Sequence, residues 1–474
     1  MIVYDSGDPN VYHMTNRLRQ VCITMPYVEI NRHLMCRYSR MYDIAIVGAG
    51  PTGLALADLV SRQGHSVAII ERASGPGGCW RIDWEQGLMT EHSPKVVFSD
   101  QKFLKSVLRK YRSDNMVPAY GGSPNVVGAV LRSFSPQDYL ILGLAVTRNT
   151  VAPYGVTVDN WLSNSGMSEG GKKLVREISL ALAQGPSMPI SLVLETMVPW
   201  RFVSGSNPMS IVDQEVWLNA WWKDIVSRPN VSYQLNTDAI HLVSSDEGQV
   251  QSVNTTRSSV ECRQCVLAVP PAALASLLER SGLQENWDGV LPEPTMPFLE
   301  RSSYTGIGFQ LHFSRETPTY NKRWCRSCDN IWSIISLPVS STWRVFTHDP
   351  SIVEVWSCVV VDTKVPVQGR YIHEMTPDQF VAECLRQLSS ALGFDVVPDR
   401  TTVHADVEPN GRISRIQRDS AFGITLGGAL PPRGTVRNLW SIGAQNSDAV
   451  ATIERGLEAA VNVAPILCKE LSML

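Results

Sequence analysis

The stretch YDIAIVGAGPTGLALADLVSRQGHSVAIIER, residues 42–72, decides the fold of this chain. Residues 44–47 form an apolar run with β-branched members, which is typical of a buried parallel strand. A glycine-rich turn follows, then apolar residues at helical spacing over 54–63, and then a second apolar run over 67–70. Strand, turn, helix and strand in this order predict the opening unit of a Rossmann-like α/β domain.

The glycines of the turn, Gly48, Gly50 and Gly53, have the spacing G-x-G-x-x-G. The first allows a tight turn, the second lets the backbone approach a pyrophosphate, and the third lets the helix pack closely on the strand. The helix N-terminus supplies N–H groups and a positive dipole for phosphate. Glu71 ends the second strand, where a carboxylate can bind the ribose hydroxyls of an adenosine. A glycine-rich turn without a ligand is the alternative.

The residues after this acid bear on which dinucleotide binds. An acidic rather than a basic residue at position 71 argues against a 2′-phosphate, and hence against NADP. The chain continues with RASGPGGCWRI, which contains a second glycine pair, Gly77 and Gly78. At this point it resembles the FAD-dependent amine oxidase superfamily, a clan that includes protoporphyrinogen oxidases and phytoene desaturases. The GGCW form is also similar to flavin monooxygenases, so this motif does not separate the two groups.

Further segments extend the resemblance to the amine oxidase clan. TEHSPKVVF (90–98) is similar to the segment of the clan that passes beside the flavin ring, with Ser93 in place of a glycine. Residues 230–253 resemble a strand and hairpin that contact the flavin through backbone near Ala239, and CVLAVPPAAL (265–274) resembles the strand and turn that follow. Residues 438–464 resemble the C-terminal flavin motif, a strand ending in a glycine and then a long helix.

The resemblance implies FAD as the cofactor and a set of residues that bind it. These are Gly48, Ala49, Gly50, Pro51, Thr52, Gly53, Glu71, Arg72, Gly77, Gly78, Trp80, Arg81, Ser93, Pro94, Ala239, Gly443, Ala451 and Thr452. The C-terminal helix also has a physical reason to lie there, because a helix N-terminus aimed at the flavin could stabilise negative charge on the reduced ring. An ordinary terminal helix packed on a sheet is the alternative.

The fold expected from these matches is a Rossmann-like FAD-binding domain assembled from discontinuous segments, with an inserted α+β substrate domain. We expect an N-terminal extension over 1–40, and FAD-binding parts over 41–100, 201–285 and 411–474. A mainly helical substrate segment over 101–200 and a sheet with helices over 286–410 complete the prediction. Residues 295–360 are predicted to form strands, because they are rich in β-branched and aromatic residues.

Two residues of the segment beside the flavin are candidate catalytic groups. His92 could accept a proton near neutral pH, and Lys95 could stabilise the reduced flavin or a substrate carboxylate. Two polar residues with a structural role are the alternative. His312, on a predicted strand, is expected to face outward or to be hydrogen-bonded. The tryptophans Trp217, Trp221 and Trp222 are expected to pack at a domain junction rather than to contact substrate.

Composition bounds the remaining possibilities. The chain has 474 residues, of which 44% are hydrophobic, and a net charge of −3, so nothing global favours a nucleic-acid partner. No apolar run approaches the roughly 20 residues that span a bilayer. We expect no metal: of the CxxC pairs, Cys262 with Cys265 and Cys325 with Cys328, the first opens an apparent buried strand. A zinc site built from these four cysteines is the alternative.

The first forty residues carry five arginines against three acids, without a clear amphipathic pattern. A loose extension before Met41 is favoured over a targeting peptide. With ten scattered cysteines that are reduced by default and no secretory signal, the expected location is the cytoplasm. The expected partner is a small-molecule substrate, and the sequence leaves the oligomeric state open.

Three functions follow from these residues. The first is an FAD-dependent oxidoreductase of the amine-oxidase type, which takes a hydride from a C–N or C–C bond. The second is a flavin monooxygenase, which the GGCW form favours. The third is a degenerate FAD-binding protein. It is favoured by departures from the clan: GIGFQLHF lacks a lysine, and GAQNSDAVATIERG lacks the aromatic residues that cage an amine and the acid that often follows the glycine.

Overall fold

The structure of the protein is a computed structural model. It describes residues 41–119, 134–148, 156–181, 190, 208–291, 293–301, 303–317, 325–326, 331–415, 421–423, 429–447 and 452–473. Residues 41–474 form one compact unit, and residues 1–40 form a separate unit outside the described part. The expectations for residues 1–40, for Cys328 and for Ala451 therefore lie outside the described residues.

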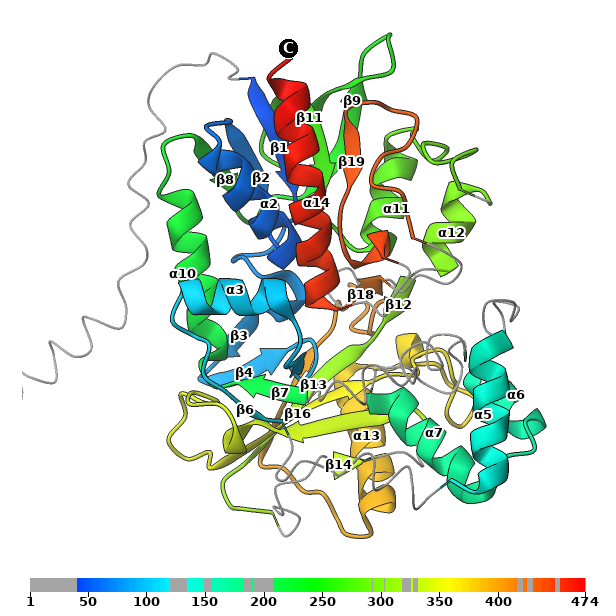
Figure 1. The fold of residues 1–474 in the computed structure, drawn as a ribbon. Coiled ribbons are helices and arrows are strands. Elements are labelled where there is room, and N and C mark those ends of the chain that lie inside the picture. Colours follow the sequence, from blue (N-terminus) through cyan, green and yellow to red (C-terminus); the bar gives the residue numbers. More distant parts are fainter. Residues whose placement is uncertain are drawn as a thin grey trace, which may run out of the picture. The chain divides into compact units, whose positions relative to one another are not determined.

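The first sheet is the one that the opening motif predicts. Strands β8 (Val231–Gln234), β2 (Val67–Ile70), β1 (Tyr42–Val47), β11 (Ser259–Leu267) and β19 (Leu439–Ser441) pair in parallel in that order. Strands β10 (Val250–Thr255) and β9 (Ala239–Ser244) continue from β11 as antiparallel neighbours. Segments far apart in the sequence thus form one Rossmann-like sheet, and the fold-class prediction is confirmed (Figure 1).

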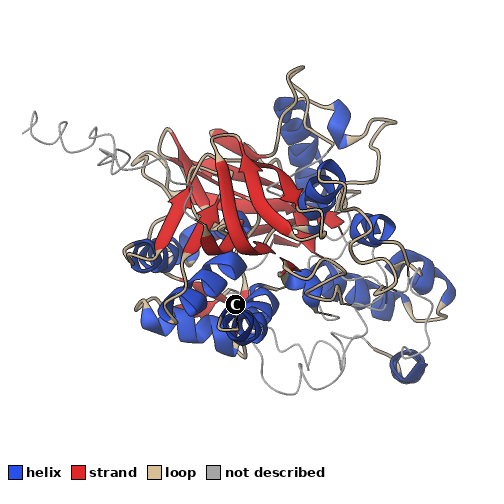
Figure 2. Ribbon diagram, turned by 90° about the horizontal axis from the view of Figure 1, so that it is seen from above, coloured by secondary structure: helices blue, strands red, loops and turns tan. Residues whose placement is uncertain are grey.

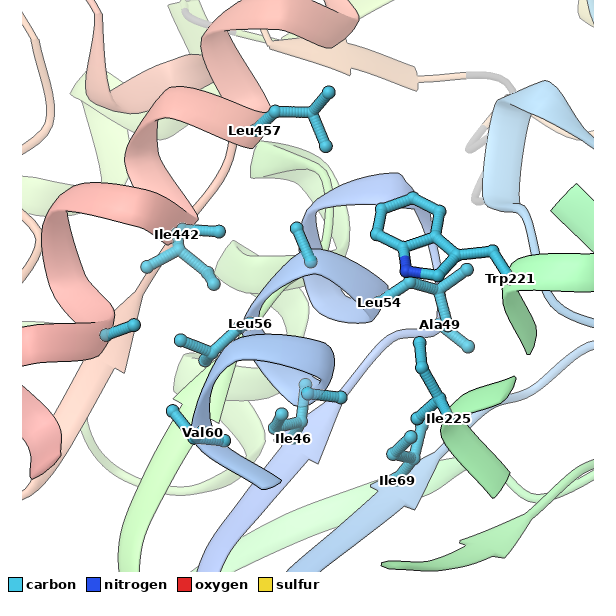
Figure 3. Packing of buried hydrophobic residues seen from close by; sticks show 14 of the residues in the cluster. Ile46, Ala49, Leu54, Leu56, Val60, Ile69, Trp221, Ile225, Ile442 and Leu457 are labelled. Atoms are coloured by element: carbon cyan, nitrogen blue, oxygen red, sulfur yellow. The ribbon is translucent and has the colours of Figure 1, made fainter. Parts of the chain in front are cut away.

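Two apolar clusters cover the two faces of this sheet, and successive residues of β1 point into them alternately. Ile44 and Ile46 belong to one cluster, Ala45 and Val47 to the other, as the period of a strand requires. The first cluster includes residues of helices α2 (Pro51–Arg62), α10 (Gln214–Val226) and α14 (Ile453–Leu471). Figure 3 shows Leu54 of α2 next to Trp221 of α10, and Leu56 of α2 on the side of Ile442. Helix α11 (Pro271–Arg280) contributes to the second cluster.

The second sheet is antiparallel, in the order β14 (Cys325–Arg326), β15 (Ile334–Pro338), β16 (Glu354–Val360), β13 (Ile307–Phe313) and β17 (Arg400–His404). Every residue of β13 and β16 is buried. Helix α13 (Pro377–Leu392) packs on one side, begins with a capping box made by Thr376 and Gln379, and ends at Gly393, which has a φ of 75°. Figure 2 shows the strands together with helices on their flanks.

Smaller elements join the two sheets. The hairpin of β3 (Ile82–Glu85) and β4 (Leu88–Glu91) lies against β13 and β17. The remaining elements are α3 (Lys102–Lys110), α5 (Pro136–Arg148), α6 (Val158–Asn164), α7 (Glu169–Ala181), α12 (Thr295–Arg301), β5 (Val97–Phe98), β6 (Met116–Pro118), β7 (Pro208–Ile211), β12 (Ser303–Thr305), β18 (Ala421–Gly423), and the short helices η1 (Gly78–Trp80), η2 (Val339–Ser341), η3 (Ile372–Glu374) and η4 (Ala444–Asn446). The boundaries of the FAD-binding and substrate domains stay a prediction.

None of the described helices is long and apolar enough to cross a bilayer. A network of charged side chains connects α2, α3 and the C-terminal end of α10 at the surface. It consists of Asp58, Arg62, Lys110, Asp224 and Arg228. The Asp224 carboxylate accepts hydrogen bonds from Lys110 at 3.0 Å and from the Tyr111 hydroxyl at 2.7 Å.

This network predicts a stability that depends on acid pH. Partial burial opposes the effect, but the hydrogen bonds from Tyr111 and Lys110 lower the pKa of Asp224 to about 2. Because the pKa is lower in the folded chain, the contribution is present above about pH 4 and is lost as the pH falls toward 2. We expect Asp224→Asn to cost about 1 kcal/mol at pH 7, since solvent screens a carboxylate that is 37% exposed, and almost nothing at pH 2.

Urea unfolding of wild type and Asp224→Asn at both pH values measures this difference. Asp246→Asn, in an exposed turn, is the matched control and should behave as wild type at both. An Asp224→Asn penalty that is equally large at pH 2 would contradict the ionic explanation.

Candidate active site

The first glycine turn has the geometry of a dinucleotide cradle. Gly48 has a φ of +103°, and a Cβ there would lie 2.4 Å from the Ala268 carbonyl oxygen. A Cβ on Gly53 would lie 2.0 Å from the Gly48 carbonyl oxygen. Gly50 differs, because a Cβ there would meet no atom within 4 Å. The turn is therefore tightly packed at its first and third glycines and open at its second, where a phosphate must approach the backbone.

Helix α2 begins beside this opening. Its N-cap is Gly50, its first residue is Pro51, and no side chain caps it. The first turn of a helix leaves N–H groups without partners inside the helix, and the one at Thr52 is such a group by position. An uncapped N-terminus beside open space fits a bound diphosphate.

Glu71 stands next to the turn, at the end of β2, and is 8% exposed. Its carboxylate accepts the N–H of Ala49 at 2.6 Å and the N–H of Ala73 at 2.8 Å. The acid is thus fixed against the glycine turn, at the place where a ribose-binding carboxylate is required. Its neighbour Arg72 points elsewhere and pairs with Asp406 at 3.7 Å.

The second glycine pair lies on the first turn. The N–H of Gly77 donates to the Ala49 carbonyl at 2.8 Å, and a Cβ on Gly78 would lie 3.3 Å from the Cα of Gly50. Trp80 packs edge-on against Trp217, with ring centroids 6.1 Å apart. Arg81 turns to Asp83, which accepts two hydrogen bonds at 2.9 and 2.7 Å from its guanidinium. These contacts bring Gly77 and Gly78, but not the Arg81 side chain, onto the cradle.

The C-terminal motif also reaches the cradle. A Cβ on Gly456 of α14 would lie 2.2 Å from Thr52 Oγ1, so the first turns of α14 and α2 touch. Thr452 is the N-cap of α14 and has no side-chain capping bond. Gly443 precedes η4, and its N–H donates to Asn446 Oδ1 at 2.7 Å. Ala239 lies buried at the start of β9, where its carbonyl accepts a bond from Arg280 at 3.2 Å.

The segment 91–95 contains both candidate catalytic residues, and it is buried against the second sheet. A Cβ on Gly308 of β13 would lie 2.2 Å from the Glu91 carbonyl oxygen and 2.3 Å from that of His92. His92 is 1% exposed, and its ring lies 6.1 Å from that of His404. Burial first, and then the positive charge of Lys95, hold the pKa of His92 well below its usual value. His92 is therefore neutral near pH 7, the form that can accept a proton, but it is a weak base.

The Lys95 side chain is 2% exposed, and its ammonium donates to the carbonyl oxygens of Cys79 at 2.5 Å and Ser93 at 2.9 Å. Glu91, the acid of the TEHSPKVVF segment, faces it at 3.4 Å. Burial raises the pKa of Glu91, and this outweighs the opposing charge of Lys95. Ser93 and Pro94 are half-buried between these groups.

The structure contradicts one of the two alternatives that the sequence offered for the His312 side chain. It does not face outward: it is fully buried on β13, with Nε2 3.4 Å from Thr402 Oγ1, so the hydrogen-bonded alternative is the better description. Burial, with a smaller effect of the Arg400 cation, lowers its pKa to about 4. The packing role expected of the tryptophans is confirmed, because Trp217 and Trp221 are buried in the first apolar cluster and Trp222 packs on it. Their place at a domain junction stays a prediction.

The depressed pKa of His312 predicts a loss of stability in mild acid. Between pH 6.5 and 4 the unfolded chain binds a proton that the folded chain rejects, so the free energy of unfolding falls as the pH falls through this window. We expect a loss on the order of 2 kcal/mol between pH 7 and pH 4.5 from this residue, and its absence in His312→Gln. Urea midpoints at both pH values measure it, with His373→Gln as the control. Equal slopes in wild type and His312→Gln would be the contrary result.

No group of three or more His, Cys, Asp and Glu side chains in the described part of the chain could hold a metal ion. Cys262 and Cys265 are both buried on β11, as the buried-strand interpretation of CRQC requires. The donor set at the cradle therefore consists of backbone N–H groups, glycines and one carboxylate. That set fits the ADP part of FAD, which needs a diphosphate site and a ribose-binding acid.

This fold and cradle define a dinucleotide-binding flavoprotein with an added antiparallel sheet. A model of the NAD(P)-binding Rossmann-like domain matches residues 46–111, and a model of the flavin containing amine oxidoreductases matches residues 218–416. Over residues 218–416 the chain matches the flavin-containing amine oxidoreductase family, which implies FAD as the cofactor. The recognition made from the sequence is thereby confirmed.

Solved structures share the fold at low identity. Putrescine oxidase has a TM-score of 0.61 and 16% identity, with 91% of this chain and 99% of that chain covered. Cyclohexylamine oxidase from Brevibacterium oxydans has the same TM-score and identity, with 91% and 100% covered. Identities this low establish the fold and leave the substrate open.

Curated relatives match over short stretches. A 4,4′-diapophytoene desaturase from Staphylococcus aureus is 41% identical over 54 residues, which are 11% of this chain and 11% of the relative. A flavin-containing monooxygenase from Arabidopsis thaliana is 43% identical over 42 residues, 9% of each. An alkene reductase/demethylase from Caballeronia cordobensis is 29% identical over 125 residues, 23% of this chain and 18% of the relative. The chain thus matches less than a fifth of the length of each of these three relatives.

Proposed function

We propose that the protein is an FAD-dependent oxidoreductase of the amine-oxidase type, acting on a C–N or C–C bond of a small organic substrate. The observation that carries this proposal is the convergence of three distant segments on the Gly48–Gly53 turn, next to a segment (91–95) buried against β13. When bound, the flavin supplies the acceptor for the hydride that leaves the substrate.

The residues of the chain have separate tasks in this proposal. Backbone N–H groups at the start of α2 bind the diphosphate, and Glu71 binds the adenosine ribose. The start of α14, which contacts Thr52, completes the cradle together with Thr452 and Gly443, which precede it in the chain. The fully buried strands β13 and β16 exclude water from the face that the segment 91–95 covers. His92, neutral near pH 7, is the group proposed to accept a proton there.

The first experiment is a visible absorption spectrum of the purified protein, with the released cofactor identified. FAD in the released fraction would justify anaerobic reduction tests with a panel of primary and secondary amines, with saturated precursors of conjugated alkenes, and with NADH and NADPH. Bleaching of the flavin by an amine or a desaturation substrate, but not by NAD(P)H, is the expected result. A colourless protein that cannot be reconstituted with FAD would overturn the proposal.

A flavin monooxygenase is the second candidate, favoured by the GGCW sequence and by the short match to the plant monooxygenase. It predicts rapid bleaching by NADPH in the same test.

A degenerate FAD-binding protein, favoured by the missing lysine and aromatic cage, predicts a bound flavin that no substrate reduces. We further propose a cytoplasmic location, because several cysteines of the described residues are free thiols: Cys79, Cys262, Cys265, Cys358, Cys384 and Cys468. Imaging of a tagged chain tests it.

A further inference from the structure

The Lys95 side chain is buried, and its ammonium group is hydrogen-bonded inside the protein. Its ammonium has three N–H donors, and three acceptors surround it: the carbonyl oxygens of Cys79 and Ser93, and Glu91 Oε2 at 3.4 Å. Lys95 is 3% exposed as a residue, and Glu91 is fully buried. The cation is thus directed at the backbone of a neighbouring turn rather than into an open substrate face.

Glu91 connects this cation to the second sheet. The Ser357 hydroxyl, on β16, donates to Glu91 Oε1. The side-chain amide of Gln310, on β13, accepts the Glu91 N–H at 3.1 Å and donates to the Glu91 carbonyl at 2.9 Å. Both the carboxylate and the backbone of Glu91 are therefore held by strands that lie more than two hundred positions away in the sequence.

Cys79 connects the same cation to the cofactor cradle. It lies in η1, within the turn Gly77–Trp80, and that turn is bonded to Ala49 and lies against Gly50. A continuous series of contacts runs from the cradle through Cys79 and Lys95 to Glu91, and from there to β13 and β16. Each link is a hydrogen bond or ion pair between buried or half-buried groups.

We propose that Lys95 is a positioning residue: its bond to the Cys79 carbonyl holds the turn Gly77–Trp80 against the segment 91–95, and so fixes the FAD cradle relative to the second sheet. This inference rests on the proposed function, because it assigns the contact a role in cofactor binding. It replaces the expectation that the Lys95 amine itself meets a substrate carboxylate.

A purely structural ion pair is the competing explanation, and Lys95→Met alone cannot distinguish the two. That change leaves the Glu91 carboxylate buried without its partner, which destabilises a protein whatever else the lysine does. The double variant Glu91→Gln/Lys95→Met removes both charges, and its glutamine amide can still accept the Ser357 hydroxyl. It also removes the bond to Cys79. In the double variant, a purely structural ion pair predicts unchanged FAD affinity, whereas a positioning role predicts weaker FAD binding at near-wild-type stability.

The test measures the FAD Kd and the urea midpoint of the full-length wild type, Lys95→Met, Lys95→Arg and the double variant. The exposed Lys102→Met is the control. We expect the double variant to unfold near the wild-type midpoint but to bind FAD roughly ten- to a hundredfold more weakly, the loss of one charged hydrogen bond. Lys95→Arg, which keeps donors at this position, should recover part of the affinity. Lys102→Met should match wild type in both measurements.

Amide exchange of residues 77–81 in the FAD-bound proteins is a second measurement, and it should be faster in the double variant than in wild type. A double variant that binds FAD as tightly as wild type, with unchanged exchange in this turn, would overturn the inference. If Lys95→Met does not fold, the double variant still decides. A wild type that binds no FAD at all would instead overturn the proposed function, so the two failures are distinguishable.

Discussion

Gly50→Ala keeps the fold of the cofactor-free protein and weakens FAD binding on the order of ten- to a hundredfold. The backbone at Gly50 has φ −67° and ψ 171°, which alanine adopts without strain, and the added methyl meets no atom within 4 Å. The same methyl occupies the space through which the diphosphate approaches the start of α2. The effect therefore falls on the bound state alone.

Two measurements check this expectation. Titration of the cofactor-free protein with FAD, followed by flavin fluorescence, gives the Kd, and urea unfolding without FAD gives the stability. We expect the unfolding free energy to stay within about 1 kcal/mol of wild type, since alanine is a poorer N-cap than glycine. Gly143→Ala on α5, where a Cβ also meets nothing within 4 Å, is the matched control and should bind FAD normally. An unchanged Kd for Gly50→Ala would place the diphosphate elsewhere.

The cradle was predictable from the sequence because its determinants are local. The glycine spacing, the apolar runs and the acid at position 71 all lie within thirty residues, and each has a direct backbone reason. The predicted second strand, 67–70, coincides with β2, and the predicted helix 54–63 starts three residues later than α2 and ends one residue later. The late start arises because Pro51, Thr52 and Gly53 lack the apolar periodicity that was used to find the helix.

The buried surroundings of the candidate catalytic residues were not predictable in the same way. The partners of Glu91, Gln310 and Ser357, lie 219 and 266 positions away, and no local pattern marks such a pair. The sequence left an outward-facing side chain possible for His312, because the residues of a strand often alternate between core and solvent. Strand β13 is covered on both faces, by the α13 cluster on one and by β4 on the other, so alternation gives no information there.

One predicted element has the wrong type. Residues 295–301 were included among the strands, whereas they form helix α12. The run TMPFLER is short and mixes apolar with polar residues, and periodicity does not separate a strand from a helix over such a length. Pro297 lies in the first turn of α12, a position where proline is tolerated because the helix does not need its N–H.

Gly50→Ala is expected to weaken FAD binding and to keep the fold. Gly308→Ala, by contrast, destabilises the protein and disturbs the site from the side of the second sheet. The added Cβ would lie 2.2 Å from the Glu91 carbonyl oxygen and 2.3 Å from the His92 carbonyl oxygen, both backbone atoms. Neither partner can move easily. Strand β13 is paired on both edges, with β16 and β17, and the backbone of Glu91 is held by Gln310.

We therefore expect Gly308→Ala to lose about 3 kcal/mol of unfolding free energy, at the upper end of what one extra methyl costs in a packed core. Because the segment 91–95 must shift, amide exchange over residues 89–95 should accelerate in the FAD-bound protein. The two variants add the same methyl, in one case to open space and in the other to backbone, so each controls for the other. Wild-type stability and exchange in Gly308→Ala would mean that β13 and this segment do not pack directly, and that the candidate catalytic residues lie outside the buried site described above.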